Sequence, residues 1–96
     1  MSIDEYEAGT DLPTVEELTD ALTAASAAHH DYESETLRGV RDEHWAGFYA
    51  AFVLGRLGPF TTASRLAELL ADVDAPSDWS AAAAHCVVTL EGERTA

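Results

Sequence analysis

The sequence predicts an all-α, single-domain fold, a four-helix bundle-like fold with short loops. Apolar residues recur at helical spacing in four segments, and short stretches rich in Gly, Pro and Asp separate these segments. No window alternates as a strand would, and the β-branched run at 86–90 follows four alanines directly, so we expect it to be helical. Ninety-six residues suffice for one modest core. We expect a flexible acidic tail at 1–12 and one helical domain at 13–92.

The first helix is predicted over about residues 14–36. Thr14 is suited to be its N-cap, and Glu17, three residues later, completes a capping-box pattern. The spacing of the apolar positions predicts one stripe that faces the core, formed by Val15, Leu18, Leu22, Ala25, His29 and Tyr32. Gly39 marks a break after this helix.

The second helix is predicted to begin at or near Asp42. Its large side chains recur at helical spacing and are expected to supply most of the bulky core: Trp45, Phe48, Tyr49, Phe52, Val53 and Leu57. Arg56 extends the same face toward the C-terminal end. Gly58 and Pro59 predict the stop, because Gly adopts the conformation that ends a helix and Pro cannot continue it.

Two further helices complete the domain. The third is capped by Thr61 or Thr62, and its predicted buried side consists of Leu66, Leu69, Leu70 and Val73. A turn at 74–77 follows. The fourth helix is predicted to begin around residues 76–78, to run to Leu90 and to end at Gly92, with Trp79, Ala83, Cys86, Val87 and Leu90 inward.

The net charge of −13 and the complete lack of lysine exclude some partners. Such a surface repels nucleic-acid phosphates and anionic lipids, so we expect neither a nucleic acid nor a membrane as partner. This composition fits two origins equally: a salt-adapted cytoplasm, as in halophiles, or a high-GC genome. A steep rise of thermal stability up to molar KCl would distinguish the first from the second.

Cysteine usage and hydropathy predict a cytoplasmic protein. Cys86 is the one cysteine, so no disulfide forms within the chain, and its apolar helical setting indicates a small core residue. No apolar run reaches the ~18 residues of a spanning helix, and no signal-peptide pattern opens the sequence.

Candidate ligands for a metal cluster in two blocks, residues 28–33 and 42–52. His29 and Glu33 are four apart and share one helix face, with His30 at its edge. Asp42 and His44 approach them if the connection around Gly39 is short. The metal hypothesis is therefore a divalent transition metal such as zinc at His29, His30, Glu33, Asp42 and His44. The spacing matches no established metal signature, so the main expectation is no cofactor.

A packing role is the favoured explanation of His29 and Tyr32. His29 continues the apolar stripe of the first helix, and Tyr32 follows it. Both are then semi-buried, with polar atoms bonded to a partner such as Glu33 or Asp42, and His30 is exposed.

A small-ligand pocket is a further hypothesis for the same region. It would be formed by His29, Tyr32, Trp45, Tyr49 and Arg56, with the aromatic rings as walls and Arg56 as anchor for a carboxylate. An aromatic stripe at helical spacing is more often core. We name no catalytic residue, because Cys86 and His85 are adjacent and point about 100° apart on a helix.

The pattern of the two blocks resembles a signature of short uncharacterised helical proteins. There it runs roughly His-His-x-Tyr-Glu, then Asp-x-x-Trp-x-x-Trp-Tyr-Ala-x-Tyr, and similar segments also occur beside glyoxalase-like (vicinal oxygen chelate) domains. In this chain, which matches over about residues 14–57, Phe48 stands for the second tryptophan and Phe52 for the last tyrosine. The resemblance implies that the two blocks lie together in space.

These observations lead to a functional hypothesis with one alternative. We expect a non-enzymatic interaction or accessory module that self-associates, most simply as a homodimer, and that could also take another protein as partner. The alternative is a small metal- or ligand-binding domain, catalytic in one version, that uses His29, His30, Glu33 and His44.

Overall fold

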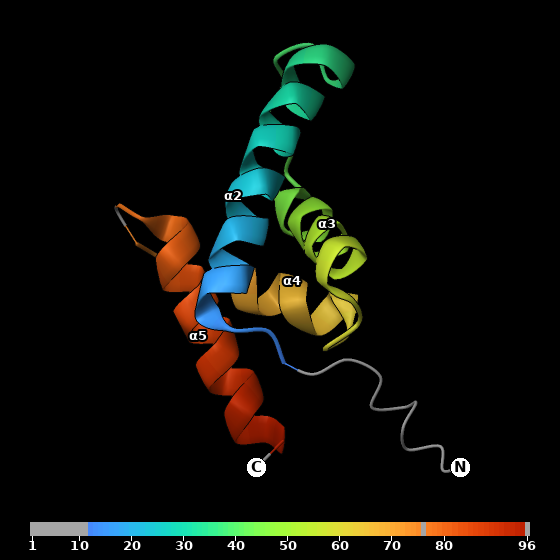
Figure 1. Cartoon of the computed structure of the whole chain (residues 1–96). Coiled ribbons are helices and arrows are strands. Elements are labelled where there is room, and N and C mark those ends of the chain that lie inside the picture. Colours follow the sequence, from blue (N-terminus) through green and yellow to red (C-terminus); the bar gives the residue numbers. More distant parts are fainter. Residues whose placement is uncertain (1–11, 76, 96) are drawn as a thin grey trace, which may run out of the picture.

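The computed structural model describes residues 12–75 and 77–95. This part of the chain contains four α-helices, one π-helical turn and no strand (Figure 1). The elements are α2 (Val15–Asp31), η1 (Tyr32–Thr36), α3 (Trp45–Leu57), α4 (Ala63–Ala71) and α5 (Trp79–Thr95). The predicted all-α, four-helix bundle-like fold is confirmed. The predicted tail at 1–12 lies, apart from residue 12, outside the described residues.

Side-chain caps start two of the helices as the sequence predicts. The Thr14 hydroxyl accepts the N–H of Glu17 at 3.0 Å, and the Glu17 carboxylate accepts the N–H of Thr14 at 2.9 Å. Thr62 accepts the N–H of Arg65 at 3.1 Å. These bonds satisfy amide groups that have no partner within the first turn, so each fixes where its helix begins.

The first helical segment has its predicted length, but its last turn is π-helical instead of α-helical. α2 ends at Asp31, and η1 continues the coil to Thr36 with wider π geometry, in which the N–H of Leu37 donates to the carbonyl of Tyr32 at 3.1 Å. A π turn is rare and often lies at a functional site. Here it carries Tyr32 and Glu33.

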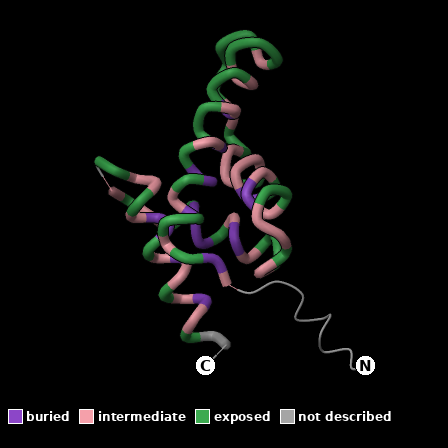
Figure 2. Tube along the Cα trace, viewed as in Figure 1, coloured by how far each residue is buried: buried purple, intermediate pink, exposed green. Residues whose placement is uncertain are grey.

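The core lies where α2, α3, α4 and α5 meet. α2 packs against both α3 and α5, and α4 contacts α3 and α5 at one end of the molecule. Buried residues concentrate in this four-helix body (Figure 2). The largest fully buried side chains are Leu18, Leu22, Val53, Leu66, Leu70 and Val87.

The predicted burial of the second and fourth helices needs correction. α3 buries its small residues Ala50 and Val53 completely, while its aromatic residues and Leu57 are only half-buried. α5 buries Ala83, Ala84, Val87 and Glu91, whereas three residues expected inward, Trp79, Cys86 and Leu90, are half-buried. Small residues let neighbouring helices approach closely, so the large rings are displaced to the rim of the core.

Two predicted boundaries are also wrong. α3 begins at Trp45 rather than at Asp42, whose carboxylate accepts the N–H of His44 in the preceding turn. α5 begins at Trp79, directly after the predicted start at 76–78, but continues past Gly92 to Thr95. Tertiary contacts explain this last difference: Glu91 is buried against Arg65, Nε to Oε2 2.9 Å, and the side chain of Leu12 lies over Gly92.

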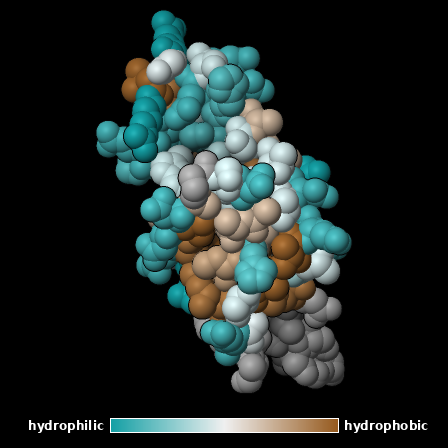
Figure 3. Space-filling model, turned by 90° about the vertical axis from the view of Figure 1, so that its left-hand side faces the viewer, coloured by the Kyte–Doolittle hydropathy of each residue, from teal (hydrophilic) through white to brown (hydrophobic). Residues whose placement is uncertain are grey.

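One part of the molecule projects beyond the body. It comprises the last turn of α2, η1 and the segment that returns to α3, residues 29–44, which we call the extension (Figure 1). Its outer surface is mainly hydrophilic, whereas apolar side chains gather over the body (Figure 3). None of the helices in the described ranges is apolar over a length that would span a bilayer.

Candidate functional site

A tight reversal at the tip of the extension positions the candidate site. Arg38 and Gly39 adopt positive φ angles of 55° and 86°, and the N–H of Gly39 donates to the carbonyl of Glu33 at 2.8 Å. Gly39 adopts this conformation without a Cβ clash, which is why the break predicted at this residue occurs. The chain then runs back along α2, so that Asp42 reaches His29, which lies 13 residues earlier.

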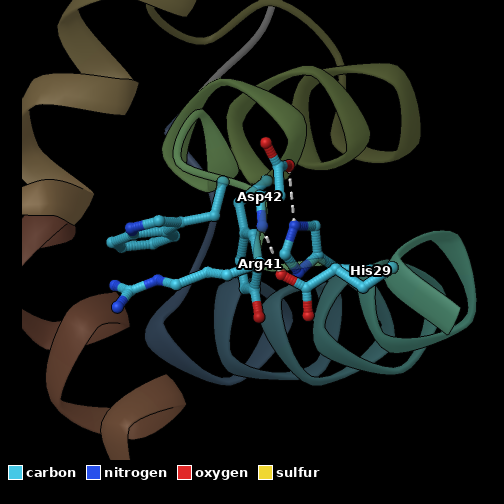
Figure 4. A pocket seen from close by; sticks show the side chains of 6 residues that line it. His29, Arg41 and Asp42 are labelled. Carbon is cyan, nitrogen blue, oxygen red and sulfur yellow. Dashed lines mark hydrogen bonds and ion pairs between the residues drawn. The ribbon is translucent and has the colours of Figure 1, made fainter. Parts of the chain in front are cut away.

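Two hydrogen bonds fasten the returning segment to α2 and η1 (Figure 4), and a third lies within the segment itself. The ring Nε2 of His29 lies 2.9 Å from Oδ2 of Asp42. The backbone N–H of Asp42 donates to Oε2 of Glu33 at 2.8 Å, and Oδ1 of Asp42 accepts the N–H of His44 at 2.9 Å. We call the group His29, Glu33 and Asp42 the clamp. It confirms the prediction that His29 is buried with a polar partner.

The charge state of Asp42 assigns the proton within the clamp. The hydrogen bond from His29, and next that from the backbone of His44, hold the pKa of the Asp42 carboxyl below its usual value. An ionised carboxylate only accepts hydrogen bonds, so Nε2 of His29 carries the proton of this bond. In the neutral imidazole the lone pair therefore lies on Nδ1. Among the described residues, no group donates a hydrogen bond to Nδ1.

Aromatic rings surround the imidazole of His29. Its centroid lies 4.9 Å from that of Phe48 and 5.3 Å from that of Tyr49, with Tyr32 further away at 6.2 Å. Edge and tilted contacts of this kind stabilise ring pairs and restrict rotation of the imidazole. The direction of Nδ1 is therefore held by packing as well as by Asp42.

The aromatic contacts continue from the clamp to the start of α5. Tyr49 contacts Trp45 at 5.4 Å and Trp79 at 5.7 Å, and the two indoles lie 5.7 Å apart. All three rings are half-buried. They form one wall between the extension and the body.

An open hollow of about 220 Å³ lies beside the clamp. It is lined by His29, Glu33, Arg41, Asp42, Trp45 and Tyr49. The side chain of Arg41 points away from the paired His29 and Asp42 (Figure 4). Liquid water occupies about 30 Å³ per molecule, so the hollow has room for roughly seven water-sized groups. It can thus hold a small polar molecule with an apolar portion against the rings.

The structure brings together part of the predicted ligand set. His29, Trp45 and Tyr49 line the hollow, and Tyr32 contacts the imidazole from outside the lining. Arg56 lies exposed in the last turn of α3 and does not line it. Arg41 takes the position predicted for Arg56 and was missed. The signal that could have found it is its place directly before Asp42, next to the second block.

The predicted metal ligands are only partly assembled. His29, Glu33 and Asp42 form the clamp, whereas the side chains of His30 and His44 are exposed and His44 contributes its backbone N–H. Within residues 12–75 and 77–95, no three side chains of His, Cys, Asp or Glu are placed to share a metal ion.

Comparison with protein families, curated proteins and solved structures finds no match for this chain. The resemblance of residues 14–57 to the short helical proteins stays a prediction. The geometry of the hollow is therefore the basis for any functional proposal.

Proposed function

We propose that this domain is a non-enzymatic binding module that holds a small polar ligand in the hollow beside the clamp. The observation that carries the proposal is the held imidazole of His29. Asp42 accepts the hydrogen bond of its Nε2, and the surrounding rings restrict its rotation. No group in the described part of the chain donates a hydrogen bond to its Nδ1. A buried histidine with one ring nitrogen available beside a hollow is suited to accept a hydrogen bond from a ligand.

The other lining groups support binding of a polar molecule. Trp45 and Tyr49 present half-buried rings, and Arg41 presents an exposed guanidinium that forms no ion pair with any described residue. Ligand sites typically combine apolar walls with a few polar groups that fix orientation. No lining side chain pairs a nucleophile with a base, which is why we propose binding rather than catalysis.

Two single-tryptophan variants test this proposal. Trp79→Phe leaves Trp45 in the wall of the hollow, and Trp45→Phe leaves Trp79 outside it. In a screen of small polar fragments, a ligand of the hollow should change the fluorescence of the Trp79→Phe protein and shift the NMR signals of His29 and Tyr49. The Trp45→Phe protein is the control, with a much smaller fluorescence change. The proposal fails if no fragment shifts the signals of residues that line the hollow.

A divalent transition metal such as zinc is a second candidate ligand. It is supported by the carboxylate behind the imidazole, because a metal-bound histidine usually donates its other ring N–H to such a group. His29 and Glu33 would be the protein ligands, and water would complete the coordination. Metal analysis of protein purified without a histidine tag tests this candidate. It requires a stoichiometric metal that is lost in His29→Ala.

We also propose that this module self-associates as a two-fold dimer. The modest core supports it, since only six large side chains among the described residues are fully buried. In the described ranges Val40 is the one large apolar residue that is exposed, so an apolar interface would have to use half-buried side chains of the body. Light scattering coupled to size-exclusion chromatography gives the mass in solution, and a monomer across the accessible concentration range would contradict a dimer.

A further inference from the structure

We infer that the ligand of the hollow is a small zwitterion, with its ammonium group at Glu33 and His29 and its carboxylate at Arg41. This inference rests on the proposed function and narrows it to a chemical class. Three observations support it. The clamp has acceptor atoms that form no hydrogen bond within the described chain, Arg41 lines the same hollow, and the chain is strongly acidic.

The clamp presents acceptors to the hollow. Glu33 uses Oε2 to accept the N–H of Asp42, and no described residue donates a hydrogen bond to its Oε1. In its neutral form the neighbouring His29 presents the lone pair of Nδ1, because its Nε2 donates to Asp42. An ammonium group offers three donors and no acceptor, so it complements a carboxylate oxygen beside an imidazole nitrogen.

Arg41 presents donors at a separate place. Its guanidinium forms no ion pair with the described residues, and its side chain extends away from His29 and Asp42 (Figure 4). Guanidinium groups bind carboxylates with two parallel hydrogen bonds. Acceptor and donor groups therefore line different parts of one hollow, which matches a ligand with opposite charges at its two ends.

The rings of Trp45 and Tyr49 complete the complementarity. They meet edge to face at 5.4 Å and are half-buried in the wall of the hollow. A short hydrocarbon part of the ligand can pack on them, and an ammonium group is attracted to aromatic faces. The open hollow has room for roughly seven water-sized groups, which suits a ligand the size of a small amino acid.

The net charge and the lining together favour a zwitterion over a simple ion. With a charge of −13, the field of the chain repels an anion and attracts a cation, but a simple cation leaves Arg41 in the wall without a partner. A zwitterion carries no net charge and satisfies both ends. Its affinity should therefore depend little on salt, whereas the affinity of an amine should fall as salt screens the attraction.

Four probes test this inference by NMR titration of the intact chain, under salt conditions in which circular dichroism shows it folded. The zwitterions are 4-aminobutyrate and leucine, and the single-charge probes are butylamine and butyrate. We expect at least one zwitterion to bind at least about tenfold more tightly than either single-charge probe, as expected for about 1.4 kcal/mol from the second charged contact. Equal or tighter binding of butylamine or butyrate overturns the inference, and so does a failure of both zwitterions to bind.

Matched variants assign the two ends. Arg41→Gln should abolish the preference over butylamine, and Glu33→Gln should abolish the preference over butyrate while its amide oxygen still accepts the N–H of Asp42. Arg56→Gln changes the net charge like Arg41→Gln but lies outside the hollow, so its binding should match the parent protein. Equal effects of Arg41→Gln and Arg56→Gln overturn the assignment.

The outcomes distinguish this inference from the proposed function. If fragments bind in the hollow but zwitterions do not, only the inference fails. If nothing binds there, the proposed function fails as well.

Discussion

The body and the extension of this protein are held together by different kinds of interaction. The body buries leucine, valine and alanine side chains between four helices. The extension is held to itself by the hydrogen bonds of the clamp and to α3 by the ring contacts of His29. Apolar burial is non-directional and tolerates small shifts, whereas the clamp depends on atoms placed within about 3 Å of each other.

This difference shows where a substitution can change ligand binding without unfolding the core. Local stability in proteins ranges from near zero to the global value, and ligand sites tend to lie in the less stable part. The hollow lies at the junction, because α3 supplies Trp45 and Tyr49 while the extension supplies Arg41 and Asp42. Changes in the clamp should therefore affect the site before they affect the core.

Removal of core volume should produce the largest effect and extend through the body. Leu22 is completely buried on α2, so Leu22→Ala should lower the free energy of unfolding by about 3 kcal/mol, as other large-to-small core substitutions do. Urea denaturation measures the change. Asp20→Ala, exposed on the same helix, is the control and should stay within about 0.5 kcal/mol of the parent.

Loss of the imidazole should act mainly on the extension. His29→Ala removes the hydrogen bond to Asp42 and the ring contacts, at a cost of about 2 kcal/mol. Amide hydrogen exchange should accelerate most in residues 29–44, with α4 and α5 still protected. An equal loss of protection in all helices would show that extension and body form one cooperative unit.

Two glycine-to-alanine substitutions should change the stability of the protein in opposite directions, one at the reversal and one in α3. Gly39 has a φ of +86° and nothing within 4 Å of a built Cβ, so Gly39→Ala should destabilise by about 1 kcal/mol through backbone strain alone. Gly47 in α3 also has open space but lacks that strained φ, so Gly47→Ala should stabilise by about 0.5–1 kcal/mol. Thermal unfolding measures both, and equal signs would contradict the assigned conformations.

The pH dependence of the clamp should be the smallest of these effects. The pKa of Asp42 is lower in the folded chain than in the unfolded one, so its contribution is present above the usual pKa and is lost as the pH falls through the folded value. The difference in unfolding free energy between the parent and Asp42→Asn should therefore shrink below about pH 4. A constant difference from neutral to acidic pH would contradict a charge-dependent clamp.

Much of the fold could be predicted because it depends on local signals. Helical periodicity indicated the stripe of Leu18 and Leu22, and hydroxyl side chains at Thr14 and Thr62 indicated two helix starts. The failures are of another kind. Trp79 and Cys86 were placed inward because hydrophobicity does not tell which of several apolar faces is covered. Glu91 was missed because its burial depends on Arg65, which comes from another helix.

The candidate site was predictable as a location but not as a geometry. The two blocks contained His29, Asp42, Trp45 and Tyr49, and the break at Gly39 suggested that they approach each other. Arg41 and Arg56 could not be ranked from the sequence. The direction of the returning segment places Arg41 beside the hollow. Arg56 is exposed at the end of α3, away from the hollow.

The sequence by itself determined the helical class, most of the helix boundaries and the acidic character, because periodicity, caps and charge are properties of neighbouring residues. The tertiary structure alone decided which ring nitrogen of His29 is occupied, where Arg41 points and how much space lies between them. Those properties depend on the reversal at Arg38 and Gly39, which joins residues 9 and 13 positions apart with bonds of 2.8 and 2.9 Å. No local pattern in the sequence specifies distances of that kind.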